Sequence, residues 1–101
     1  MDTAINMTDE VLLTLKNELG LHARPADLFV RCANSFQCDI YAYNQTRNAE
    51  KKVNAKSILG VLSIGVRGGD TVRIVANGKD CKEAVEALKA LIETNFEEAA
   101  A

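Results

Sequence analysis

The sequence predicts an α+β domain in which three helices cover one face of a four-stranded antiparallel sheet. Segments with the two-residue apolar period of half-buried strands are interspersed with segments carrying helical apolar stripes. Their order is β, α, β, β, α, β, α, and one-sided strands and helices bury one another best in two layers. With 101 residues and 48% apolar content, the chain can build one core, so we expect one domain.

The first strand and helix are predicted from apolar spacing. Residues 1–9 are polar and unpatterned, which predicts a flexible tail ahead of a domain at 10–98. Pro25 falls in the first helical turn, where its missing N–H is tolerated. The apolar positions are Val11, Leu13 and Leu15 in a strand over 10–16, and Ala26, Phe29, Val30 and Ala33 in a helix over 23–36.

A hairpin is predicted next. Residues 38–43 alternate around Ile40 and Ala42, residues 44–50 are typical of a polar turn, and residues 51–53 form a short return strand.

The remaining elements follow a serine and a run of glycines. The Ser57 hydroxyl can accept a hydrogen bond from a helical N–H, which predicts a short helix through about residue 62. Residues 71–76 alternate as a fourth strand and end at an Asn-Gly turn. Asp80 and Glu83 resemble a capping pair ahead of a closing helix, whose apolar stripe is Ala84, Val85, Leu88, Leu91 and Ile92.

Composition excludes several classes of function. A formal charge of −2 lacks the basic footprint of a nucleic-acid binder. No apolar run approaches the roughly 20 residues of a membrane span, and the acidic N-terminus is unlike a secretory signal. We therefore expect a cytoplasmic protein with no membrane or nucleic-acid partner.

The cysteines and the single histidine argue against metal chemistry. Cys32, Cys38 and Cys81 are odd in number and form no Cys-x-x-Cys pair, as expected of reduced thiols with structural roles. One histidine cannot build an imidazole cluster. We expect neither a metal nor a cofactor.

The chemistry of the sequence is concentrated at that one histidine. His22 lies between the first strand and the first helix, and Arg24 follows two residues later. A helix start favours an anion through its N–H groups and its dipole, and an arginine fork can bind phosphoryl oxygens. An imidazole is substantially neutral near pH 7, so its lone pair can attack phosphorus. The alternative is that His22 is an ordinary surface residue near a helix end.

Two motifs favour the phosphate interpretation. Gly-Leu-His-Ala-Arg-Pro-Ala at 20–26 resembles the phosphorylation signature of the histidine-containing phosphocarrier (HPr) family of the bacterial sugar phosphotransferase system. Lys-Ser-Ile-Leu-Gly-Val-Leu-Ser-Ile-Gly at 56–65 resembles the family's second signature. The similarity runs from about residue 11 to residue 96, which is nearly the whole domain.

The resemblance implies an open-faced β-sandwich and a carrier function. His22 would be phosphorylated through Nδ1 by Enzyme I, using phosphoenolpyruvate, and would donate to Enzyme IIA components. Arg24 would stabilise the phosphoryl group, the amides of Ala23 and Arg24 would face it, and Pro25 would fix the first helical turn. Such a carrier is not a turnover enzyme, and we expect a monomer.

The second motif implies regulation and docking. Ser57 matches the serine that an ATP-dependent HPr kinase/phosphorylase modifies in some bacteria, although a capping role alone also accounts for it. The helix at 57–62 has more apolar residues than one face can bury. Some of them are therefore expected to form a docking patch beside His22 for Enzyme I, the Enzyme IIA components, the kinase/phosphorylase or a transcriptional regulator. The candidates are Ile58, Leu59, Val61 and Leu62.

Two departures from the family pattern keep alternatives open. The segment from Tyr43 to Val53 is about four residues longer than is typical, which predicts an extended loop at 44–50. Leu19 replaces the small polar residue common before the motif's glycine and resembles the nitrogen-related paralogue, NPr. A carrier in a nitrogen-related or regulatory phosphorelay is therefore the first alternative, and a module that only binds regulators or enzymes is the second.

Overall fold

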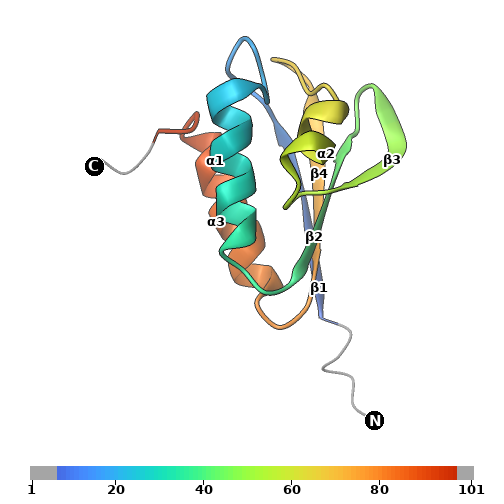
Figure 1. The fold of residues 1–101 in the computed structure, drawn as a ribbon, viewed down its shortest axis with the longest axis vertical. Helices are drawn as coiled ribbons and strands as arrows, with labels where there is room; N and C mark the ends of the chain where they lie inside the picture. Colours follow the sequence, from blue (N-terminus) through green and yellow to red (C-terminus); the bar gives the residue numbers. More distant parts are fainter. Residues whose placement is uncertain (1–6, 98–101) are drawn as a thin grey trace.

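Residues 7–97, as described in a computed structural model, form a sheet with helices packed against one face (Figure 1). The strand order is β1-β4-β2-β3, and all neighbouring strands are antiparallel. This confirms the α+β class, the element order and the four-stranded sheet. The elements are β1 (Thr8–Thr14), α1 (Ala23–Asn34), β2 (Asp39–Asn44), β3 (Asn48–Asn54), α2 (Ile58–Ser63), β4 (Thr71–Asn77) and α3 (Cys81–Glu93).

The core lies between the sheet and the helices. The central strand β4 buries every second side chain, so the predicted alternation is confirmed there. Each buried methylene contributes roughly 0.8 kcal/mol to folding. Large side chains that are less than 2% exposed include Leu15, Phe29, Ile40, Ile74, Leu88 and Ile92.

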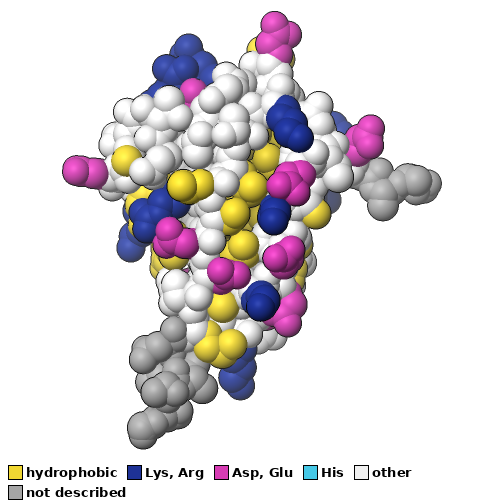
Figure 2. Space-filling model, turned by 180° about the vertical axis from the view of Figure 1, so that it is seen from behind, with side chains coloured by type: hydrophobic (Ala, Val, Ile, Leu, Met, Phe, Trp, Pro, Cys, Tyr) yellow, Lys and Arg dark blue, Asp and Glu magenta, His cyan; other side chains and the backbone are white. Residues whose placement is uncertain are grey.

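The opposite face of the sheet is open and carries both charged and apolar side chains. Arg73 pairs with Glu10 at 3.3 Å, and its guanidinium lies 4.8 Å from the ring centroid of Tyr43. Figure 2 views the molecule from behind, where a vertical band of apolar side chains is bordered by charged ones.

The first strand begins earlier than predicted. β1 starts at Thr8, so Thr8 and Asp9 belong to the sheet and not to the tail. Thr8 pairs with Asn77 of β4, and its hydroxyl donates to the Asn77 side chain at 2.8 Å. Strand pairing, which needs no apolar side chain, extends the element here. The rest of the predicted tail, residues 1–6, and the predicted domain end at residue 98 lie outside the described residues.

The predicted loop at 44–50 is wrong, because most of that segment is strand. β3 begins at Asn48 and pairs with β2 through Asn44, which leaves a turn of only three residues, 45–47. Asn44 closes the turn by accepting the Arg47 N–H at 3.2 Å. β3 buries only Val53, since it is an edge strand with charged side chains, and its sequence therefore shows no apolar alternation.

The helix ends also differ from expectation. α1 stops at Asn34 and not at Phe36, because the Asn34 and Ser35 side chains donate to the last carbonyls, those of Val30 and Cys32. The proposed capping role of Asp80 is wrong. Its carboxylate makes no capping bond to α3 and instead accepts the N–H groups of Gln37 and Cys38, each at 2.9 Å.

Candidate functional site

His22 stands at the start of α1 with its side chain exposed to solvent. It is the N-cap residue, with φ −138° and ψ 160°, and its imidazole makes no capping bond to the first helical turn. Ser, Thr, Asp or Asn at this position would direct an oxygen at the helix. The His22 ring is therefore not used to close α1 and remains accessible to an incoming group.

The loop before His22 is held by the segment between α2 and β4. The Leu21 N–H donates to the carbonyl of Val66 at 2.9 Å, and the Gly68 N–H donates to the carbonyl of Glu18 at 3.2 Å. Gly20 has φ +70°, and a Cβ there would lie 2.2 Å from the Val66 carbonyl oxygen. Only glycine permits this approach of two backbones.

The first turn of α1 combines backbone strain with favourable electrostatics for an anion. Ala23 has φ +45°, in the left-handed region that costs a residue with a Cβ about 1–2 kcal/mol. Pro25, in the same turn, has no backbone N–H that would need a partner. The positive end of the helix dipole and the exposed Arg24 lie beside His22 in sequence, so this turn can stabilise a phosphoryl group on the imidazole.

Ser57 occupies the equivalent position of α2, and the cap predicted for it is confirmed. Its Oγ accepts the Gly60 N–H at 3.0 Å. The start of α2 lies near the C-terminal end of α1, because the Asn34 side chain donates to the Lys56 carbonyl at 3.1 Å. In Figure 1, α1 begins at the end of the molecule where α2 finishes. His22 and Ser57 therefore mark opposite ends of this helix pair.

The exposed side of α2 carries an apolar patch. Leu59 is 78% exposed, whereas Ile58 and Leu62 are 40% and 42% exposed. We call these three residues the α2 patch. Val61, the fourth candidate, is fully buried and belongs to the core. Three large apolar side chains on one six-residue helix form a surface suited to a protein partner.

The cysteines lie in protected surroundings. All three are free, Cys38 and Cys81 are buried, and Cys32 is partly buried. Burial raises the pKa of the Cys38 thiol to about 12, and the hydrogen bond to Asp80 acts in the same direction. A thiol that stays protonated is a poor nucleophile and a poor metal ligand. These surroundings fit the structural role expected of the cysteines.

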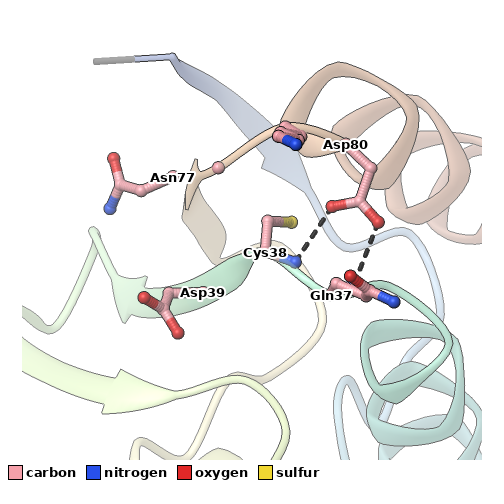
Figure 3. A pocket seen from close by; sticks show the side chains of 7 residues that line it. Gln37, Cys38, Asp39, Asn77 and Asp80 are labelled. Atoms are coloured by element: carbon pink, nitrogen blue, oxygen red, sulfur yellow. Dashed lines mark hydrogen bonds between the residues drawn. The ribbon is translucent and has the colours of Figure 1, made fainter. Parts of the chain in front are cut away.

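A hollow of about 410 Å³ lies at the far end of the molecule from the start of α1 (Figures 1 and 3). It is formed by the residues that join α1 to β2 and β4 to α3. Figure 3 shows the Asp80 carboxylate turned toward Gln37 and Cys38, whose N–H groups it accepts. The Gln37 N–H is the main cause of the lowered pKa of Asp80. The Asp80 carboxylate therefore bonds the connection between β4 and α3 to the connection between α1 and β2.

One polar cluster escaped the sequence analysis. Asp70 is 3% exposed, and its Oδ2 accepts Arg47 Nε at 2.8 Å, the Arg67 N–H at 2.9 Å and the Asn44 amide at 3.2 Å. Arg47 is the largest cause of its lowered pKa. No periodicity or motif signals these contacts, because Arg47 and Asn44 lie 23 and 26 residues from Asp70 in the sequence.

Within residues 7–97, none of the helices is long and apolar enough to cross a membrane. Within the same range, no group of three or more His, Cys, Asp or Glu side chains is arranged to hold a metal ion.

Comparison with known proteins places this site in a family. A family model described as the PTS HPr component phosphorylation site matches residues 10–94. The HPr-like protein Crh of Halalkalibacterium halodurans is 44% identical over 84 residues, which are 83% of this chain and 95% of that protein.

Two solved structures share the fold closely. HPr-C-His from Thermoanaerobacter tengcongensis has a TM-score of 0.81 and 48% identity, with 90% of this chain and 99% of that chain covered. The phosphocarrier protein HPr from Bacillus anthracis has a TM-score of 0.78 and 39% identity, with 86% and 99% covered. Since the family model spans most of the chain and includes the His22 and Ser57 motifs, this chain belongs to the HPr family of phosphocarrier proteins.

Proposed function

We propose that this protein carries a phosphoryl group on His22 from Enzyme I to Enzyme IIA proteins for sugar uptake. The observation that carries the proposal is the exposed imidazole at the start of α1, which makes no capping bond to that helix. The imidazole nitrogen attacks phosphorus, the bond from phosphorus to the donor nitrogen of phosphorylated Enzyme I breaks, and the donor keeps the electron pair. Transfer to an acceptor histidine reverses these roles.

The surroundings of His22 supply charge stabilisation for this transfer. The N–H of Ala23 and the guanidinium of Arg24 stabilise the phosphoryl oxygens, and Pro25 keeps the first turn in place. A loose, in-line transition state needs positioning more than covalent help from the protein. A short helix start with one arginine is therefore sufficient, and the protein acts as a carrier and not as a turnover enzyme.

The α2 patch supplies the contact with partners. The helix that exposes Ile58, Leu59 and Leu62 packs against α1 and finishes at the end of the molecule where α1 begins, so a protein seated on the α2 patch is proposed to reach His22 as well. Enzyme I and the IIA proteins, which exchange phosphate with the same atom, are proposed to use this surface in turn. We place these encounters in the cytoplasm.

We also propose Ser57 as a regulatory site for an HPr kinase/phosphorylase. A phosphate on its Oγ would sit at the positive end of the α2 dipole, so the helix tolerates it. It would add about two negative charges beside the α2 patch, which disfavours an acidic partner. Incubation with such a kinase and ATP is expected to label the wild type and to leave Ser57→Ala unlabelled.

Two observations favour other branches of the same family. Leu19 is 65% exposed near the start of α1, where a nitrogen-type Enzyme I would meet it. Crh of Bacillus subtilis, 43% identical to this chain, is described as the catabolite repression HPr, which favours a regulatory partner such as a transcriptional regulator. Comparing phosphorylation rates with general and nitrogen-type Enzyme I separates the sugar branch from the nitrogen branch.

We propose a monomer in solution, as one domain with a complete core requires no second copy. The crystal structure of Bacillus subtilis Crh, 40% identical to this chain, shows a domain-swapped dimer. Light scattering across a concentration series distinguishes the two states.

The carrier function is tested by phosphorylation with phosphoenolpyruvate and Enzyme I. Intact mass is expected to show one added phosphoryl group that is lost in acid, and His22→Ala is expected to show none. If neither the general nor the nitrogen-type Enzyme I modifies the wild type, the result would favour the alternative in which this chain only binds regulators or enzymes.

A further inference from the structure

The turn between β2 and β3 lies against the end of the segment that supports His22. The Gln45 N–H donates to the Thr71 carbonyl at 2.9 Å, and the Thr71 N–H donates to Thr46 Oγ1 at 2.9 Å. Arg47, the third turn residue, pairs with Asp70 at 2.8 Å. All three residues of the turn therefore hold the chain at residues 70 and 71.

The Arg47 contact matters because Asp70 is buried. A buried carboxylate is costly unless cations and hydrogen bonds compensate for the lost water. Arg47 supplies the charge, and the same oxygen, Oδ2, also accepts the Arg67 N–H at 2.9 Å. Asp70 therefore closes the bend over residues 67–70, with Arg47 fixing the carboxylate from outside.

This bend is bonded to the loop that precedes His22. The Leu15 N–H donates to the Asp70 carbonyl and the Gly69 N–H to the Leu15 carbonyl, both at 2.9 Å. At its other end, Val66 accepts the N–H of Leu21, the residue before His22. A displacement of the bend is thus transmitted through backbone hydrogen bonds to the backbone of the histidine.

We propose that Arg47, acting through Asp70, positions His22 for phosphoryl transfer. The inference rests on the proposed carrier function and makes Arg47 a positioning residue that touches neither the imidazole nor the phosphoryl group. Its physical basis is the sensitivity of in-line transfer to placement, because a displacement of about 1 Å at a reacting atom can lower a rate roughly 100-fold.

Arg47→Ala tests this proposal through the rate of transfer from phosphorylated Enzyme I. At a temperature where the variant is fully folded, the rate at saturating carrier is expected to fall about 10-fold. The half-saturating concentration should stay unchanged, since the proposed docking residues on α2 are intact. Arg47→Lys, which keeps a cation near Asp70, should recover part of the rate.

Arg73→Ala is the matched control. It also removes an arginine from an ion pair, that with Glu10, but on the open face of the sheet. Its transfer rate should remain within about twofold of the wild type, as the loss of one surface pair has little effect. An equal fall in both variants would overturn the proposal, and so would an Arg47→Ala defect confined to the half-saturating concentration.

Amide hydrogen exchange at Leu21 provides a readout that does not depend on Enzyme I. Arg47→Ala is expected to speed exchange of this amide several-fold, whereas Arg73→Ala should leave it unchanged. Unchanged exchange in Arg47→Ala would contradict the positioning claim. If the wild type itself takes up no phosphate, the proposed carrier function fails, and the exchange result alone then decides whether Arg47 fixes the backbone before His22.

Discussion

The start of α1 at His22 and the start of α2 at Ser57 are stabilised in different ways. Both residues are N-caps with extended backbones, but Ser57 directs its hydroxyl at the Gly60 N–H, whereas the His22 imidazole makes no such bond. The start of α1 is instead held from outside, through the Leu21 bond to Val66. A helix start that keeps its side chain available for chemistry thus depends on support from a segment remote in sequence.

This difference predicts that the two helix starts respond to substitutions at different places. The start of α1 should respond to substitutions in the supporting segment, and the start of α2 should respond to its own cap. Changes at Gly20 and Asp70 test the first statement, and a change at Ser57 tests the second. A change at Ala23 tests the backbone strain within the first turn of α1.

Gly20→Ala should have the largest effect. Its Cβ would lie 2.2 Å from the Val66 carbonyl oxygen at φ +70°, so the two backbones must separate. We expect a loss of about 4 kcal/mol in the free energy of unfolding by urea denaturation, together with a strongly reduced rate of phosphorylation.

Gly65→Ala is the control for Gly20→Ala. Gly65 has φ +54° but nothing within 4 Å of an added Cβ, so only the backbone strain of about 1 kcal/mol applies. Equal losses for the two variants would show that close packing against Val66 does not support the start of α1.

Asp70→Asn should have the next largest effect, roughly 2 kcal/mol near neutral pH, because it removes charge-assisted hydrogen bonds. The pKa of Asp70 is lowered, chiefly by Arg47, so its charged form stabilises the fold. That stability is fully present above the ordinary value of 3.8 and is lost as the pH falls through the lower folded-state pKa. Between pH 7 and pH 2, the free energy of unfolding measured by urea denaturation should fall less in Asp70→Asn than in the wild type.

Ser57→Ala and His22→Ala together measure how much each N-cap side chain contributes to the free energy of unfolding. Removing the Ser57 cap should cost about 1 kcal/mol. His22→Ala, which removes no capping bond, should change the free energy of unfolding by less than about 0.5 kcal/mol. Thermal and urea denaturation of both variants check this order, and a larger loss for His22→Ala would refute the distinction between the two helix starts.

Ala23→Gly should give the smallest change, a gain of about 0.5 kcal/mol. Glycine relieves the strain at φ +45° but loses more backbone entropy on folding, so the two effects largely offset each other. A shift of the melting temperature upward by a few degrees is the expected observation. A clear destabilisation would mean that the left-handed backbone at Ala23 is not strained.

The sequence predicted the parts of the fold that depend on side-chain periodicity. β4 and α3 matched their apolar patterns, and Ser57 was recognised as a cap from its residue type alone. β3 was predicted too short because an edge strand with one buried residue shows no alternation. Asp80 was assigned to the wrong partner, because the N–H groups of Gln37 and Cys38 compete with those of α3 for its carboxylate.

The site was predictable in its residues but not in its support. A unique histidine before a helix containing Arg24 and Pro25 indicated phosphate chemistry. The approach of Gly20 to Val66 and the burial of Asp70 depend on tertiary contacts between segments about 25 to 45 residues apart, beyond the reach of a local pattern. The contribution of Arg47 could not be anticipated either, since its segment was expected to be a loop.

The assignment of the phosphoryl group to the start of α1 is tested most directly by removing His22 and Ser57 in turn. With phosphoenolpyruvate and Enzyme I, Ser57→Ala should take up one acid-labile phosphoryl group at the wild-type rate, and His22→Ala should take up none, as measured by intact mass and ³¹P NMR. Phosphorylation that persists in His22→Ala, or that is lost in Ser57→Ala while the protein remains folded, would contradict the assignment of the phosphoryl group to the start of α1.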